Sequence, residues 1–421
     1  MIEIKKINNL DCEIVAPPSK AYTLRAIFIA AMAKGNSIIN NPLMAEDQKY
    51  TINAMKDMGV DIKLRNNKII IKGVNGKFKN SKNNLFIGNS GVSARVLIVL
   101  CSLIDQDTII NGTERMRIGR PIQDLINAIK NLGINAKSIN NNGCLPVSVK
   151  GNSFQGGLTT LKGNKSSQYF TALLLCAPYA KRDVTIKTIG DLCSKPYIDI
   201  TIDIMKRFGI KVENKDYQEF KIKSNHSYIG KEYYIEGDYS NAAYFFAAAA
   251  ITKGKIRVKN LNFNSIQGDK RFLDFIEMMG CEINKEDGYI EVIGKPLKGI
   301  KVDMQDYPDI VQPLAIVAAF ARDESEFYNI SNLKYKECDR LKATVTELKR
   351  IGINANFTEN SIIVEGGKPH GAEIETYKDH RMVMSFSIIG LAVEGIKIKN
   401  PENINKSFPE FFDVLNNIYK K

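Results

Sequence analysis

Two helix patterns alternate along the whole chain. In the first pattern, an amphipathic segment ends in glycine and is followed by alternating apolar and polar residues. The five glycines lie 71–76 residues apart, at Gly59, Gly133, Gly209, Gly280 and Gly352. A glycine just past a helix is typical of a left-handed C-cap. The alternating stretches that follow, such as Lys68–Lys72 and Ser361–Glu365, predict the strands of hairpins.

The second pattern is a helix that is apolar on nearly all sides and follows a polar residue. Its six copies start 70–76 residues apart, at Ser19, Ser90, Ser166, Asp238, Asp309 and Asp379. A helix that is apolar all round is expected to be buried. The chain is therefore predicted to contain six copies of one unit, each with one buried and one amphipathic helix.

The sixth copy lacks its hairpin at the C-terminal end. The N-terminal segment IEIKKINNLDCEIVA has the alternation of strands and is predicted to complete that copy. Three copies per domain then give a first domain over residues 14–228 and a second domain over residues 1–13 and 229–421. The chain would cross between the domains near Val15–Pro18 and Ser227–Lys231.

Composition agrees with a large globular protein. The 421 residues are 44% hydrophobic and 25% charged, which is enough for two cores. The longest apolar runs, Val96–Ile104 and Tyr244–Ile251, are too short to span a membrane, and MIEIKKINNL lacks the apolar core of a signal peptide. Seven scattered cysteines and three histidines favour reduced thiols in the cytoplasm and argue against a metal site.

The net charge of +13 allows two interpretations. A basic surface can bind nucleic acid, but the positive residues can also surround a site for anionic metabolites. No dense Lys/Arg block or aromatic RNA-binding motif is present. Charge alone leaves both possibilities open.

The starts of the apolar helices are candidate anion sites. A helix N-terminus offers free N–H groups and the positive end of the helix dipole. Basic residues lie at or near three of the six starts, at Lys20, Arg25, Arg95 and Arg381. The alternative is that the Ser and Asp residues are simple N-caps and that each arginine forms a structural ion pair. Repetition at equivalent positions favours anion binding.

Eleven ordered motifs make the chain resemble one enzyme family. They are PPSKAYTLRA, GNSGVSAR, GRPIQDL, KSSQYFTALLL, SKPYIDIT, GDYSNAAYF, NSIQGDKRF, YPDIVQPLA, YKECDRL, YKDHRMVM and NKSFPEFF. Together they resemble the 5-enolpyruvylshikimate-3-phosphate (EPSP) synthase family over essentially the whole chain. This resemblance implies two domains of three βαβαββ repeats, often described as inside-out α/β barrels.

The resemblance also implies the reaction. The family transfers the enolpyruvyl group of phosphoenolpyruvate to the 5-hydroxyl of shikimate 3-phosphate and releases phosphate, on the route to chorismate and aromatic amino acids. It needs no metal or organic cofactor. Two anions must be held together, one carboxylate must accept the hydroxyl proton, and another acid must protonate the enol carbon.

Site residues follow from the motif positions. The resemblance assigns proton acceptance to Asp309, proton donation to Glu337 and contact with both substrates to Lys20. It places Lys20, Ala21, Arg25, Ser166, Ser167, Gln168, Ser194, Tyr197, Asp309, Asn332 and Lys336 at shikimate 3-phosphate. It places Lys20, Asn89, Gly91, Arg120, Gln168, Arg340, Arg381 and Lys406 at phosphoenolpyruvate, and no residue at a metal.

Two positions depart from the family pattern. Ala21 stands where a serine hydroxyl normally contacts shikimate 3-phosphate, and such a bond to a charged group is worth roughly 1.5–3 kcal/mol. Val92 replaces a residue that is often threonine in the glycine-rich turn. We expect both changes to alter the site without abolishing it.

Three alternatives to this function remain at this stage. The related enolpyruvyl transferase that acts on UDP-N-acetylglucosamine shares the fold, but the SSQ and SKPY motifs favour shikimate 3-phosphate. A basic nucleic-acid-binding protein would show a steep salt dependence of binding. A non-catalytic relative is disfavoured by the retention of both Asp309 and Glu337. The expected partners are the two small substrates, for a protein that works as a monomer with no nucleic acid and no membrane.

Overall fold

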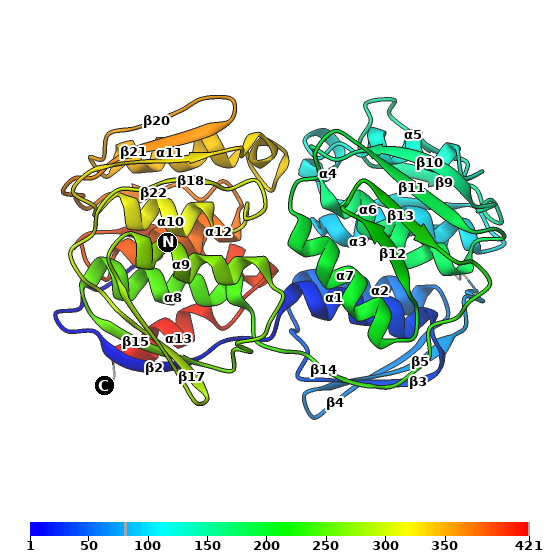
Figure 1. The fold of residues 1–421 in the computed structure, drawn as a ribbon, viewed down its shortest axis with the longest axis horizontal. Coiled ribbons are helices and arrows are strands. Elements are labelled where there is room, and N and C mark those ends of the chain that lie inside the picture. The colour runs from blue at the N-terminus through cyan, green and yellow to red at the C-terminus, as the bar shows by residue number, and fades with distance from the viewer. Residues whose placement is uncertain (80–81, 420–421) are drawn as a thin grey trace. The chain divides into compact units, whose positions relative to one another are not determined.

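The computed structural model describes residues 1–79 and 82–419 and divides the chain into two compact units. The first unit is Pro18–Ile235, and the second unit combines Met1–Pro17 with Glu236–Lys421. Figure 1 shows the helices and strands of each unit. The predicted bounds were residues 14 and 228. The first division, after Pro17, lies within the expected crossing at Val15–Pro18, and the second, after Ile235, lies a few residues beyond Ser227–Lys231.

Each unit contains three repeats, and all but the last repeat have the four predicted strands. In the second, third, fifth and sixth repeats, the strand that precedes the buried helix pairs in parallel with the strand that follows it, whereas in the first and fourth repeats a strand from elsewhere in the chain takes that place. In the first five repeats, the strand that follows the buried helix also pairs with one strand of the hairpin. The four-stranded sheets of the first unit are, in order, β14 (Glu232–Tyr234), β3 (Lys34–Asn40), β5 (Lys68–Val74) and β4 (Asp61–Arg65); β6 (Asn84–Phe86), β7 (Thr108–Asn111), β9 (Val147–Val149) and β8 (Ala136–Ser138); and β10 (Gly157–Lys162), β11 (Val184–Ile189), β13 (Glu219–Ile222) and β12 (Val212–Lys215).

The second unit repeats this strand order. Its sheets are β2 (Asp11–Val15), β15 (Lys255–Lys259), β17 (Tyr289–Ile293) and β16 (Glu282–Glu286); β18 (Lys301–Asp303), β19 (Glu324–Tyr328), β21 (Ser361–Glu365) and β20 (Ala355–Phe357); and β22 (Glu373–Ile374), β23 (Lys397–Ile398) and β1 (Ile2–Glu3). The predicted α/β repeat fold is thus confirmed, as six small sheets, and none of the sheets among the described residues closes into a barrel.

The apolar helices are buried because they have no polar face to offer to water. They are α1 (Lys20–Met32), α3 (Gly91–Leu100), α6 (Ser167–Cys176), α8 (Tyr239–Thr252), α10 (Val311–Ala318) and α12 (His380–Ile389). In the second unit, α8, α10 and α12 all pack against one another. Each core is therefore built around helices, while strands such as β2 alternate buried and exposed residues.

The second helix of each repeat is amphipathic. These helices are α2 (Glu46–Asp57), α5 (Gln123–Lys130), α7 (Lys195–Arg207), α9 (Arg271–Met278), α11 (Arg340–Arg350) and α13 (Phe411–Ile418). All five glycines predicted as C-caps have φ between 81° and 116°, a region that favours glycine. Residues 420 and 421, which follow α13 in the sequence, lie outside the described residues.

The N-terminal strands correct one prediction. We expected the first 14 residues to supply the missing hairpin of the last repeat. Strand β1 does join that sheet, antiparallel to β23, but β2 pairs in parallel with β15 in the fourth repeat. The fourth repeat needs β2 because β14, which precedes α8 in the sequence, pairs with β3 in the first unit.

Two further observations concern the whole chain. All seven cysteines are buried, and none of them forms a disulfide. Among residues 1–79 and 82–419, no helix combines the length and the apolar character needed to cross a membrane.

Candidate active site

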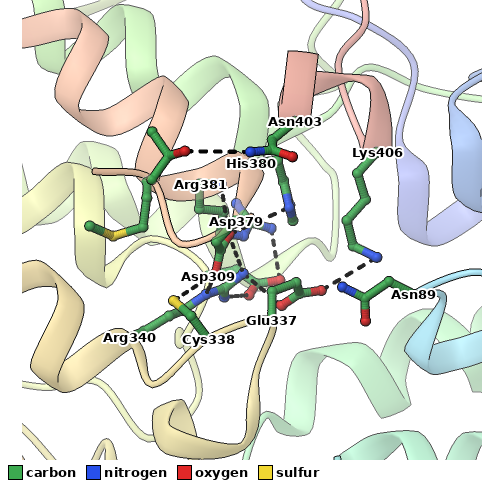
Figure 2. A network of polar contacts seen from close by, with 12 residues as sticks. Asn89, Asp309, Glu337, Cys338, Arg340, Asp379, His380, Arg381, Asn403 and Lys406 are labelled. Carbon is green, nitrogen blue, oxygen red and sulfur yellow. Dashed lines mark hydrogen bonds and ion pairs between the residues drawn. The ribbon is translucent and has the colours of Figure 1, made fainter. Parts of the chain in front are cut away.

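Five of the predicted site residues form one network in the second unit, centred on Arg340 (Figure 2). Arg340 Nη1 lies 3.0 Å from Asp309 Oδ1, and Arg340 Nη2 lies 2.9 Å from Glu337 Oε2. Arg381 Nη2 lies 2.8 Å from Asp309 Oδ2, and Lys406 Nζ lies 3.6 Å from Glu337 Oε1. Both predicted proton-transfer carboxylates are thus bound to predicted phosphoenolpyruvate cations.

Arg340 is the most enclosed cation of this network. Its side chain is 1% exposed, and its Nε and Nη2 also donate to Asp379 at 2.8 and 3.2 Å. Burial alone lowers the pKa of Arg340, but the carboxylates of Asp379, Glu337 and Asp309 outweigh burial and raise it. The guanidinium therefore stays charged, with all three nitrogens bound to carboxylates.

Asp309 is not the N-cap that the alternative interpretation suggested. Helix α10 begins at Val311 and Ile310 occupies the cap position. The carboxylate of Asp309 instead bridges Arg340 and Arg381, and Arg381 also donates to Tyr244 Oη at 3.1 Å. The side chain of Asp309 is 17% exposed, so one of the two proposed proton-transfer groups reaches solvent.

The charges of this network balance. Three carboxylates, on Asp309, Glu337 and Asp379, face three cations, on Arg340, Arg381 and Lys406. Buried ions are tolerated only when they are paired in this way. An incoming anion must therefore displace a carboxylate from a guanidinium or ammonium group.

Asp379 has a larger role than its sequence position indicated. In line with the N-cap alternative, it caps α12, accepting from Arg381 N at 2.9 Å. It also binds Arg340 and accepts from Cys338 Sγ at 3.4 Å, while the ring of buried His380 places Nδ1 3.5 Å from Asp379 Oδ1. Burial, followed by the charge of Asp379, raises the pKa of the Cys338 thiol well above its ordinary value. Cys338 is therefore a protonated donor.

Two more predicted residues lie just before Glu337. Asn332 is in the 3₁₀ helix η4 (Ser331–Tyr335) and is 4% exposed, and its Oδ1 accepts no hydrogen bond from the described residues. Lys336 follows this helix and is half-buried. An unpartnered buried acceptor next to the ion network is consistent with a ligand-binding position.

In the first unit, a second group of predicted residues surrounds the start of α3. Arg120 Nη1 donates to the carbonyl and side-chain oxygens of Asn89 at 3.1 and 3.4 Å. A Cβ added at Gly91 would overlap Arg120 Nη2 and lie 2.8 Å from Gln168 Oε1. Only glycine at position 91 leaves room for these side chains to approach the helix start.

Arg25 joins three helices of the first unit. It is 2% exposed and donates to Ala21 O, Thr201 Oγ1 and Tyr197 O at 2.9, 2.8 and 3.0 Å. A further bond, at 3.3 Å, reaches Thr171 Oγ1 on α6. Burial lowers the pKa of Arg25 to about 10. This arginine has a structural role that its motif position did not reveal.

The remaining predicted residues of the first unit lie at the starts of α1, α6 and α7. Lys20 and Ala21 begin α1 and are half-buried. Ser166 caps α6, accepting from Gln168 N at 3.3 Å, and Ser167 is the first residue of that helix. Ser194 precedes α7 with φ 58°, and Tyr197 lies in its first turn. Arg25 binds to both α1 and α7, so two of these starts are adjacent.

Two contacts of the second unit were not predicted. The first is Tyr244 with Arg381, and the second is buried Glu347 with Tyr377. The motifs GDYSNAAYF and YKDHRMVM contain the tyrosines, but nothing in the sequence indicates which partner each one binds.

Comparisons with known proteins identify the family of this chain. The family model for EPSP synthase (3-phosphoshikimate 1-carboxyvinyltransferase) matches residues 4–415. Two relatives with the name 3-phosphoshikimate 1-carboxyvinyltransferase, from Nostoc punctiforme and Actinobacillus pleuropneumoniae serotype 3, are each 40% identical, over 98% of this chain and 97% of their own length. A solved EPSP synthase from Acinetobacter baumannii superposes with a TM-score of 0.83 at 27% identity, covering 99% of this chain and 97% of that one.

Proposed function

Because this chain belongs to the EPSP synthase family, we propose that the two groups of site residues serve one reaction. The chain transfers the enolpyruvyl group of phosphoenolpyruvate to the 5-hydroxyl of shikimate 3-phosphate and releases phosphate, in the pathway to chorismate and aromatic amino acids. UDP-N-acetylglucosamine as the acceptor is not favoured, because the relatives found carry the shikimate name.

The ion network around Arg340 carries the assignment of the chemical step. Asp309 accepts the proton of the 5-hydroxyl as the hydroxyl oxygen bonds to C2 of phosphoenolpyruvate. Glu337 gives its proton to C3, which forms a tetrahedral intermediate. In the second half, the bond between C2 and the phosphate oxygen breaks, the leaving phosphate takes the proton held on Asp309, and C3 returns a proton to Glu337. Both carboxylates lie within 3.0 Å of Arg340, so one cation orients both groups.

Phosphoenolpyruvate binds in this proposal to Arg340, Arg381 and Lys406 in the second unit. All three are at most 7% exposed and are now occupied by carboxylates. An incoming phosphate competes with Asp309 and Glu337 for the same donors. Displacing Glu337 from its cations removes the charges that favour its ionised form, which promotes the protonated state that a donor needs. Substrate binding and proton loading are thereby linked.

The first unit supplies the remaining phosphoenolpyruvate contacts and most of the shikimate 3-phosphate contacts. Asn89, Gly91, Arg120 and Gln168 take the former role, and Arg25, Ser166, Ser167, Gln168, Ser194 and Tyr197 take the latter, with Lys20 at both substrates. Asn332 and Lys336 add to shikimate 3-phosphate from the second unit. Helix starts and cations together favour dianionic phosphate. Neither unit is expected to work alone.

We further propose that the protein acts as a monomer in the cytoplasm, without nucleic acid. Seven buried cysteines without a disulfide are consistent with a reducing compartment. Light scattering measures the molar mass in solution and so tests whether the protein is a monomer. Polynucleotide mobility at low salt tests the nucleic-acid-binding alternative, and a retarded band would contradict our proposal.

The function is tested by phosphate release. We expect release only when phosphoenolpyruvate and shikimate 3-phosphate are both present, with each omitted in turn as the control. Replacing the acceptor by UDP-N-acetylglucosamine is expected to give none. Release with that acceptor, or from phosphoenolpyruvate alone, would contradict the proposal.

A further inference from the structure

Glu347 is a buried carboxylate outside the proposed substrate contacts. It lies in α11 with its side chain 0% exposed. Tyr377 Oη donates to its Oε1 at 2.6 Å, while Arg350 Nε and the Glu375 N–H donate to its Oε2 at 2.8 and 3.1 Å. A buried carboxylate is costly unless its oxygens are satisfied, so these three contacts define one conformation.

The partner segment has an unusual backbone. Tyr377 and Lys378 both adopt left-handed conformations, with φ of 53° and 56°. Residues other than glycine, asparagine and aspartate rarely adopt this backbone conformation, and two such residues in succession need support from their surroundings. Asp379 comes next, returns to extended backbone and caps α12. The left-handed pair thus sets the direction in which Asp379 leaves the segment.

Helix α11 holds this segment at two points. Arg340 and Glu347 are seven residues apart, so they lie two turns apart on the same face of the helix. Arg340 binds Asp379, and Glu347 binds Tyr377 and the Glu375 N–H. Burial, followed by the bond to Glu347, raises the pKa of Tyr377, so its hydroxyl remains a donor.

We propose that Glu347 is a positioning residue for the phosphoenolpyruvate cations and acts through Tyr377. The contact between Glu347 and Tyr377 holds the left-handed residues Tyr377 and Lys378 in place. These residues position Asp379 beside Arg340 Nε. Asp379 then orients both Arg340 and the first turn of α12, which contains Arg381. The inference rests on the proposed role of Arg340 and Arg381 at phosphoenolpyruvate.

The main test is Tyr377→Phe, which removes one hydroxyl. We expect KM for phosphoenolpyruvate to rise about 10-fold, while kcat and KM for shikimate 3-phosphate change less than twofold. Tyr419→Phe is the matched control, because this tyrosine of the same unit donates to Lys5 O at 2.6 Å. It is expected to lower the unfolding midpoint without changing either KM. An unchanged KM for phosphoenolpyruvate in Tyr377→Phe would overturn the proposal.

Variants at Glu347 separate positioning from general stability. Glu347→Gln keeps an oxygen that Tyr377 can donate to, so we expect KM for phosphoenolpyruvate to stay within threefold of the original protein. Glu347→Ala removes the acceptor and is expected to match Tyr377→Phe. Arg350→Gln, at a side chain 46% exposed, leaves the Tyr377 contact intact and should change neither KM. Equal effects of the Gln and Ala variants would contradict the proposed contact.

Arg340→Lys tells this proposal apart from the proposed function. If Arg340→Lys raises KM for phosphoenolpyruvate and Tyr377→Phe does not, only the positioning role fails. If Arg340→Lys leaves that KM unchanged, the phosphoenolpyruvate assignment itself fails. A proportional loss of all activity in Tyr377→Phe, matching the loss of folded protein, would assign Tyr377 a structural role only.

Discussion

The two units hold their buried arginines in opposite ways. In the first unit, Arg25 donates to backbone carbonyls and threonine hydroxyls, and burial lowers its pKa to about 10. In the second unit, Arg340 is equally buried, but three carboxylates surround it and raise its pKa. One cation is held by neutral dipoles and the other by opposite charges.

This difference separates two tasks. Neutral partners leave the charge of Arg25 uncompensated, so an arriving phosphate meets net attraction. Carboxylate partners neutralise Arg340, so an anion gains there only by exchanging with Asp309, Glu337 or Asp379. The first arrangement suits binding, and the second couples binding to proton transfer. Predictions for each unit should therefore differ in kind.

The largest expected effect is on turnover. Glu337→Gln keeps an acceptor for Arg340 but removes the acidic proton, so we expect kcat to fall roughly 1,000-fold, within the range lost with a general acid. Both KM values should change only a few-fold. Steady-state phosphate release measures this, with exposed Glu359→Gln as the control. Normal turnover would exclude Glu337 as the donor.

The next effect concerns stability and pH in the second unit. Asp269 is 3% exposed and accepts from the Ser240 hydroxyl. Burial, followed by the charge of Asp309, raises its pKa to about 6. The native state then keeps a proton that the unfolded chain has released, so stability falls as pH rises from about 4 to about 6. Above this window the loss is complete.

Asp269→Asn should remove that pH dependence. We expect the free energy of unfolding of the original protein to fall by about 3 kcal/mol more than that of the variant across this window. Urea unfolding at pH 3.5 to 7.5 measures the slopes. Asp274→Asn, at a side chain 41% exposed, serves as the control and should keep the original slope. Parallel curves for Asp269→Asn and the original protein would contradict the role of Asp269.

Periodicity predicted the repeats because the burial of an apolar helix and the end of a helix at a glycine can both be inferred from the local sequence. The confirmed strands β5 and β21 follow from local alternation in the same way. The pairing of β2 with β15 could not be predicted, because its alternation fits any sheet with one buried face. Which sheet a strand joins depends on contacts far along the chain.

The site shows the same limit. The motifs indicated Asp309, Glu337 and Arg340. In the structure, both carboxylates lie within 3.0 Å of the guanidinium group of Arg340. Glu347 was missed because a glutamate in an amphipathic helix is ordinarily a surface residue. Its carboxylate accepts from Tyr377, whose left-handed backbone no residue type in YKDH specifies.

A smaller effect is expected for Arg25→Ala in the first unit. We expect affinity for shikimate 3-phosphate to fall about 30-fold, the size of a bond to a charged group. The variant also loses bonds to three helices, so stability must be measured beside it. Thr201→Val removes the 2.8 Å partner of Arg25 Nε and controls for this loss. It should be less stable, with affinity within threefold. Equal loss of affinity in both variants would assign Arg25 a structural role alone.

The smallest effect is expected for Gly91→Ala at the start of α3. The new Cβ would overlap Arg120 Nη2 and approach Gln168 Oε1 to 2.8 Å, so the guanidinium has to move. We expect KM for phosphoenolpyruvate to rise about 10-fold, which corresponds to the loss of one hydrogen bond, with kcat nearly unchanged. Gly367→Ala, where the Cβ meets only Ile353 Cδ1 at 3.2 Å, should leave both KM values unchanged. If Gly91→Ala also left both KM values unchanged, Arg120 would have no part in binding phosphoenolpyruvate. The first unit would then bind only shikimate 3-phosphate, and the second unit would supply all the contacts to phosphoenolpyruvate.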